Sequence, residues 1–352
     1  MQRLNEKEFR NKVTVISFVL SLLIVSFHAH NLTVYLINAN DGALEKIIVN
    51  LQDFIHNIEE IGVPFFFMIS GYLFFRKFEL KNTMLKWKNR FWSVFVPYVV
   101  WGFLYWLYYY ILKNLPGIGQ LMNMDDISLS LYSIATVVFA HNHTVFWYLQ
   151  TLLLYILLAP LLYICLKDYR KSFSGLVVLG IIICISSGMT PIDIFSWGGG
   201  FFPKRLWTIS YFSTGAYVAI NHREFVLYKS KLLTILGCVG SLICSILIQF
   251  SYGRGLLLCV FCVSVWLATN IFSFNFEIKW WMKISFFIYC IHSAILEAVE
   301  KVILVIGGKS VVWCLLDYII APIITVVIIF AVAKILQRFP KVWQLLNGGR
   351  GI

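Results

Sequence analysis

Residues 13–34 read VTVISFVLSLLIVSFHAHNLTV, a stretch in which the first fifteen side chains include no charge. A helix of this length, at about 1.5 Å per residue, is long enough to cross the hydrocarbon core of a bilayer. The whole chain has a similar character, since 60% of its 352 residues are hydrophobic and 13% are charged. Soluble domains average about 45–50% apolar and about 25% charged residues. The sequence therefore predicts an integral membrane protein and excludes a disordered chain or a secreted disulfide scaffold.

The positions of the cations predict the topology. Most of the 29 Lys and Arg residues fall between alternate apolar segments, as is typical of short cytoplasmic loops. The net charge of +12 therefore indicates membrane orientation and not a nucleic-acid partner. We expect an all-α polytopic bundle of about ten transmembrane helices with both termini in the cytoplasm. The candidate spans are residues 13–34, 61–75, 91–112, 144–166, 174–188, 206–221, 232–250, 255–274, 284–305 and 310–333.

The same pattern predicts a single bundle with short flanking segments. We expect a cytoplasmic N-terminal segment at residues 1–12, one transmembrane domain at 13–335 and a cytoplasmic tail at 336–352. Residues 35–60, which are rich in acidic side chains, are expected to form a long outside loop.

Two histidines lie inside predicted spans and are candidate catalytic residues. His28 is expected in the outer third of the first span, and His292 lies in the ninth. Ionisable side chains at membrane depth are costly, so each one is a candidate for function. A neutral imidazole titrates near neutrality, which suits a general base. The alternative for each is a structural hydrogen bond to a neighbouring helix.

Two groups of cations are candidates for ligand binding. Lys86, Lys88 and Arg90 lie in the most basic inside loop and could hold the phosphates of a nucleotide-containing thioester. They could equally hold anionic lipid or only fix the orientation of the chain. Lys204 and Arg205 lie on the predicted outside, against the charge rule, and could orient an anionic or sugar acceptor. No metal site is predicted. Cys259 and Cys262 have the spacing of a metal or redox pair, but they lie inside an apolar run with no second pair and no loop histidine.

Several segments resemble the membrane acyltransferase-3 family, the ten-helix O-acyltransferases that modify bacterial surface glycans. They occur in family order and together cover nearly the whole chain. These segments are VPFFFMISGYL at 63–73, VPY at 96–98, FWYL at 146–149, YFSTG at 211–215 and SFFIYCIH at 285–292.

The resemblance implies a bacterial plasma-membrane enzyme with no metal. Its donor would be acyl-CoA, most simply acetyl-CoA, and its acceptor a glycan or lipid-linked sugar at the outer face. His28 matches the catalytic base of the family, His292 matches the histidine of a late span, and Arg90 matches a cation associated with the donor. We assign Lys204, Arg205 and Trp147 to the acceptor side.

One position departs from the family pattern. The family has an arginine ten or eleven residues before the first-helix histidine, where this chain has Phe18 or Ser17. Lys12, about one turn lower, is the cation that could supply the missing charge.

Two functions follow as hypotheses. In the first, an O-acyltransferase uses His28 to accept the proton of a sugar hydroxyl, or forms an acyl-histidine intermediate. In the second, a transporter or flippase moves a lipid-linked sugar through the same cavity without chemistry. The hydropathy pattern shows no clear inverted repeat of the kind that many transporters have.

Overall fold

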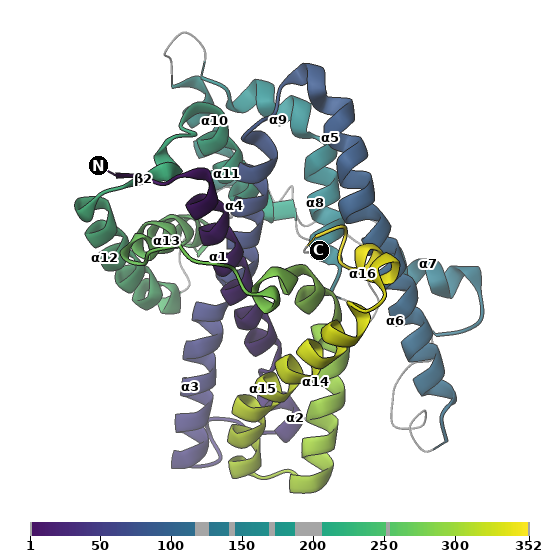
Figure 1. The fold of residues 1–352 in the computed structure, drawn as a ribbon. Coiled ribbons are helices and arrows are strands. Elements are labelled where there is room, and N and C mark those ends of the chain that lie inside the picture. Colours follow the sequence, from purple (N-terminus) through teal and green to yellow (C-terminus); the bar gives the residue numbers. More distant parts are fainter. Residues whose placement is uncertain are drawn as a thin grey trace.

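The computed structural model describes residues 2–116, 127–140, 145–168, 173–186, 206–250 and 254–350. Within these ranges the chain is a bundle of helices (Figure 1). Two short strands, β1 (Gln2–Arg3) and β2 (Tyr228–Lys229), pair in antiparallel register and join the start of the chain to a later loop. The all-α class that the composition predicts therefore describes the architecture, apart from this one ladder.

The helices begin and end as follows. They are α1 (Glu6–His28), α2 (Leu32–Tyr35), α3 (Ala43–Glu59), α4 (Gly62–Phe75), α5 (Thr83–Arg90), α6 (Val96–Asn114), α7 (Leu131–Phe139), α8 (Trp147–Leu157), α9 (Ala159–Leu166), α10 (Ser174–Ser186), α11 (Ile209–Asn221), α12 (Lys231–Leu247), α13 (Arg254–Ala268), α14 (Ser285–Gly307), α15 (Val311–Leu336) and α16 (Pro340–Leu346).

Each apolar segment predicted as a span overlaps one of these helices or a helix pair. By length and composition, six helical runs in the described part of the chain are able to cross a membrane. The bent pair α8–α9 makes a seventh if it is one span; its two halves meet at 63° beside Pro160, which cannot donate a backbone hydrogen bond. The chain is thus a helical membrane protein, while the count of ten spans and the cytoplasmic position of both termini stay predictions.

The prediction of a loop at residues 35–60 was wrong. Most of this range is α3, which joins α4 in a single helical run from Ala43 to Phe75. The acidic residues concealed this helix because a hydropathy average does not distinguish an amphipathic helix from a loop. In α3 the buried side chains are Ile48, Gln52 and Glu59.

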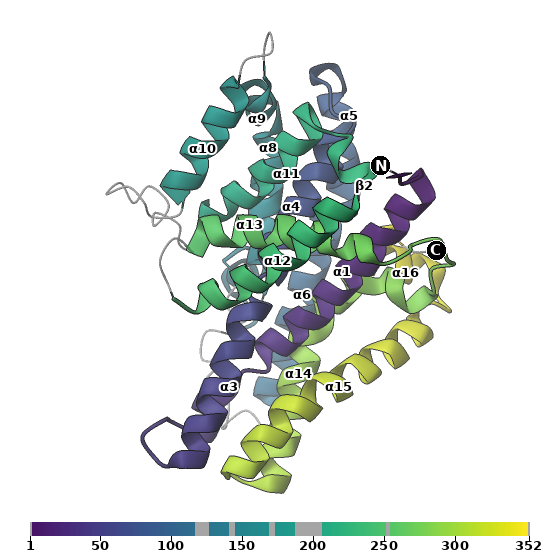
Figure 2. The same ribbon diagram turned by 90° about the vertical axis from the view of Figure 1, so that its left-hand side faces the viewer.

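Helices α3, α14 and α15 extend toward one end of the molecule, and α5, α9 and α10 lie at the other (Figure 1; Figure 2). Helix α1 runs between these ends and contacts α3, α4, α14 and α15. It therefore connects α3, α14 and α15 to α4, and its side chains contribute to both parts of the site described below.

Helices α4 and α11 pack with their backbones in close contact. A Cβ atom at Gly71 would overlap the carbonyl oxygen of Phe212, and one at Gly215 would overlap that of Met68. Small residues at a helix crossing allow this approach, which is a common source of packing energy between membrane helices. Two of the family-like segments, 63–73 and 211–215, thus meet at this crossing.

We expect Gly215→Ala to destabilise the bundle, because the new methyl group forces the α4 and α11 backbones apart. Overpacking of this kind costs about 1–3 kcal/mol. The matched control is Gly180→Ala in α10, where a Cβ atom meets nothing within 4 Å. Thermal unfolding of the purified protein in detergent compares the two, and equal stability of both variants would contradict the close crossing.

Candidate functional site

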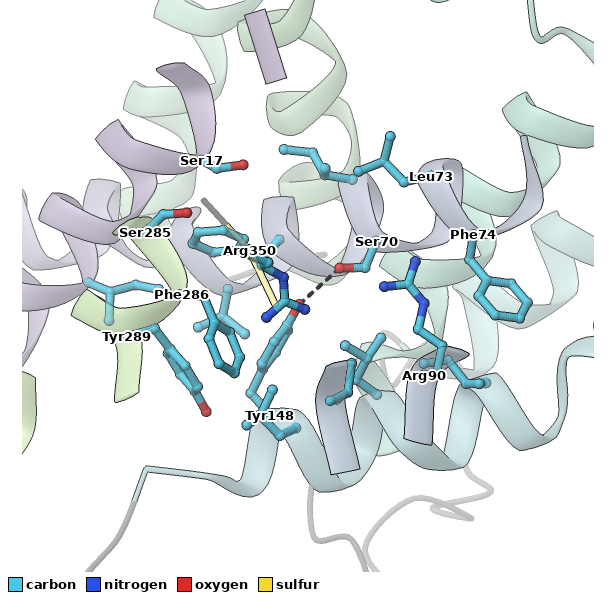
Figure 3. Close-up of a pocket in the computed structure, with 18 residues that line it drawn as sticks. Ser17, Ser70, Leu73, Phe74, Arg90, Tyr148, Ser285, Phe286, Tyr289 and Arg350 are labelled. Atoms are coloured by element: carbon cyan, nitrogen blue, oxygen red, sulfur yellow. Dashed lines mark hydrogen bonds between the residues drawn. The ribbon is translucent and has the colours of Figure 1, made fainter. Parts of the chain in front are cut away.

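A cavity of about 220 Å³ lies between α1, α4, α8, α14 and the segment that follows α16 (Figure 3). Most of its lining is aliphatic or aromatic, and none of the described residues that line it is a carboxylate. The polar or charged lining side chains include Ser17, Ser70, Arg90, Tyr148, Tyr289 and Arg350. The cavity is therefore apolar over most of its surface and positively charged in two places.

Arg90 is the last residue of α5 and lines the cavity. The next five residues, Phe91–Phe95, form a π-helical turn that leads into α6. Such turns are rare and frequently occur at functional sites. The Arg90 guanidinium lies 5.8 Å from the ring centre of Phe74, and within the described ranges it forms no ion pair.

The other two cations predicted for the donor do not line this cavity. Lys86 donates a hydrogen bond of 3.0 Å to the carbonyl oxygen of Phe74, and Lys88 is exposed. Residues four apart share a face of a helix and residues two apart do not. Lys86 and Arg90 therefore both reach Phe74, while Lys88 points away from them.

Arg350 is the cation in this cavity that the sequence did not reveal. It lies in the segment predicted to be a cytoplasmic tail, and its guanidinium stacks 4.1 Å from the ring centre of Phe286. Its Nη1 atom is buried and has no hydrogen-bond partner among the described residues. Burial, and secondarily the charge of Arg90, lowers the pKa of Arg350 to about 10. A single arginine after two glycines has no pattern that could have assigned it to a site.

Ser70 and Tyr148 both line the cavity, and their hydroxyl groups form a hydrogen bond of 3.1 Å. The Tyr148 ring packs against that of Tyr289, with 5.6 Å between ring centres. Tyr289 in turn donates a hydrogen bond of 2.8 Å to the carbonyl oxygen of Val145. These contacts fix a polar wall between α4, α8 and α14.

The two predicted catalytic histidines come together. The rings of His28 and His292 lie 5.2 Å apart, centre to centre. His292 is fully buried, and its Nδ1 lies 2.8 Å from the carbonyl oxygen of Tyr289. Because a carbonyl can only accept, Nδ1 carries the proton, and a neutral His292 has its lone pair on Nε2. That Nε2 is buried and has no hydrogen-bond partner in the described part of the chain.

This histidine pair lies just beyond the cavity and not in its lining. The lining includes Ile24 and Tyr289, which are about one helical turn from His28 and His292 respectively. His28 is the last residue of α1 and is exposed. The site therefore has two parts, an inner cationic cavity and an outer histidine pair, joined by α1 and α14.

The remaining predicted residues fall elsewhere. Lys204 and Arg205 lie outside the described residues. Trp147 begins α8, and its ring packs 6.4 Å from that of Phe67. Lys12 does not supply a charge to the cavity, because its Nζ donates to the carbonyl oxygen of Trp266 at 2.8 Å and to Asn270 Oδ1 at 2.6 Å.

Comparison with known proteins gives one clear finding. Residues 13–337 match a family model described as an acyltransferase domain. No curated protein and no solved structure matches the chain. The matched residues include the histidine pair and every lining residue of the cavity except Arg350.

Proposed function

The chain belongs to the membrane acyltransferase-3 family, and we propose that it moves an acetyl group from cytoplasmic acetyl-CoA to a hydroxyl of an envelope or exported glycan. The observation that carries this proposal is the arrangement of the two-part site along α1 and α14. A cationic cavity suits an anionic donor, and a pair of histidines about one turn further suits proton transfer from an acceptor. We place the enzyme in a bacterial plasma membrane.

In this proposal the cavity holds part of the donor. Sites that enclose a whole small molecule measure about 300–1,000 Å³, whereas this cavity measures about 220 Å³. We infer that the nucleotide end stays near Arg90, whose planar guanidinium suits phosphate oxygens. The apolar lining then accommodates the thioester arm, which extends toward Tyr289 and the histidine pair.

The proposed reaction is a single acyl transfer. His28 accepts the proton of a sugar hydroxyl as that oxygen attacks the thioester carbonyl. A carbon–oxygen bond forms, the carbon–sulfur bond breaks, and the thiolate leaves with the electron pair and takes the proton from His28. His292 is a positioning residue, since its ring is held by the backbone of α14 and lies against that of His28.

Transport of a lipid-linked sugar without chemistry has less support. The family match is to an acyltransferase domain, and it spans the helices that carry both parts of the site.

We expect His28→Ala to lower transfer from labelled acetyl-CoA to envelope glycan by about 100-fold or more, because general-base catalysis typically contributes about 10²–10⁴-fold. His292→Ala should lower it less, because that residue acts through His28. The matched control is His222→Ala, an exposed histidine at the end of α11 that lies outside both parts of the site. Undiminished transfer by folded His28→Ala protein would remove the proposal.

The roles of the inside cations are separable by substitution. Arg90→Ala should weaken the apparent affinity for acetyl-CoA by about tenfold or more, because hydrogen bonds to charged groups contribute about 1.5–3 kcal/mol. Lys88→Ala, which removes an exposed cation two residues earlier, should change it little. Initial rates over a range of acetyl-CoA concentrations measure both. A larger effect at Lys88 than at Arg90 would show that the donor binds outside this cavity.

A further inference from the structure

The segment that follows α15 packs onto the bundle. The indole N–H of Trp101 in α6 donates a hydrogen bond of 2.9 Å to the carbonyl oxygen of Leu346 at the end of α16. Trp343 is buried, and its ring packs 5.1 Å from that of Phe287 in α14. Helix α16 is thus held by α6 and by α14, of which α14 contributes to the cavity lining (Figure 1).

A glycine turn then directs the chain back toward the cavity. Gly348 and Gly349 have φ angles of +62° and +71°, in the left-handed region that glycine adopts at little cost. A Cβ atom at Gly348 would overlap the carbonyl oxygen of Ser93, in the π-helical turn after Arg90. The turn therefore requires glycine for its backbone angles and for its close approach to the segment that carries Arg90.

Arg350 emerges from this turn with its charge uncompensated. Lys12 shows how this bundle satisfies a buried cation, with two oxygen acceptors and the face of Trp266. The Arg350 guanidinium has the face of Phe286, but its Nη1 is buried without an acceptor, and it forms no ion pair within the described ranges. Among the charged groups that act on it, Arg90, another cation, has the largest effect. Two converging cations without an anion are costly in a poorly solvated site.

The hydroxyl groups nearby complete a set of donors. Figure 3 shows the guanidinium groups of Arg90 and Arg350 on either side of the Ser70–Tyr148 hydrogen bond. Guanidinium forks bind phosphate oxygens through paired hydrogen bonds, and hydroxyl groups can donate to the oxygens that remain. The lining contributes no carboxylate that would compete with such an anion.

We propose that Arg350 and Arg90 together form a binding site for a phosphate group, and that the docked segment after α15 completes this site by delivering Arg350. If the proposed function holds, on which this assignment of the ligand rests, the phosphate belongs to the nucleotide of the thioester donor. Arg350 then contributes to donor affinity from outside the helices that carry the histidine pair.

Calorimetric titration of the purified full chain in detergent tests this site. The probes are CoA, inorganic pyrophosphate, and pantetheine, which has the thiol arm of CoA but no phosphate. Arg350→Ala should weaken the binding of CoA and of pyrophosphate by tenfold or more and leave that of pantetheine unchanged. Arg350→Lys should recover part of the loss, because it keeps the charge without the fork.

Two further variants test whether binding depends on the position of the glycine turn and not on the general charge of this segment. Gly348→Ala should weaken CoA and pyrophosphate binding in the same direction, since its side chain displaces the turn. Lys341→Ala removes an exposed cation of α16 and should leave all three affinities within twofold.

The outcomes distinguish this site from the proposed function. Pyrophosphate binding that depends on Arg350, without any binding of CoA, would support the phosphate site and remove the acyl-CoA donor. CoA binding that Arg350→Ala leaves unchanged would overturn the phosphate site and leave the proposed function standing. Tighter CoA binding by the Arg350→Ala variant would also overturn the phosphate site, because the Arg350 side chain would then block the cavity and have to be displaced by CoA.

Discussion

The cost of burying charge in a bundle of apolar helices constrains every part of this structure. Lys12 and Arg350 are two buried cations that this cost affects differently. Lys12 is fully buried near the start of α1 and is satisfied by Trp266 and Asn270, so it fastens α1 to the end of α13. Arg350 enters the cavity without an acceptor for its Nη1 among the residues that the structure describes. Lys12 is therefore satisfied within the fold, whereas the buried charge of Arg350 is costly without a partner, which supports the proposed phosphate site.

Helices α1 and α14 connect the two parts of the site because each contributes to both. Helix α1 carries Ser17 in the cavity lining and ends at His28. Helix α14 carries Tyr289 in the lining and His292 one turn later. Groups placed on packed helices keep their separation more precisely than groups placed on loops. The cationic cavity and the histidine pair therefore have a fixed spacing, which the proposed transfer between two faces of a membrane requires.

Much of the scaffold could be predicted from the sequence, because apolar runs of this length have few alternatives to a helix. The histidines could be proposed one by one from their cost at membrane depth, but their contact depends on how α1 packs against α14. Arg90 was grouped with Lys86 and Lys88. Helical periodicity separates Lys88 from the other two, and Lys86 bonds to Phe74 without lining the cavity. Helix α3 was missed because its apolar residues form only one stripe. Arg350 was missed because the packing of α16 and the glycine turn, and no local pattern, bring it to the cavity.

The central claim is that the cationic cavity and the histidine pair serve one transfer reaction. An experimental structure of the full chain with a non-hydrolysable acetyl-CoA analogue tests this claim most directly. The account predicts phosphate density between Arg90 and Arg350 and an acyl carbonyl that has passed Tyr289 to reach His28. Density for the analogue with its acyl end directed away from α1 and α14 would contradict it.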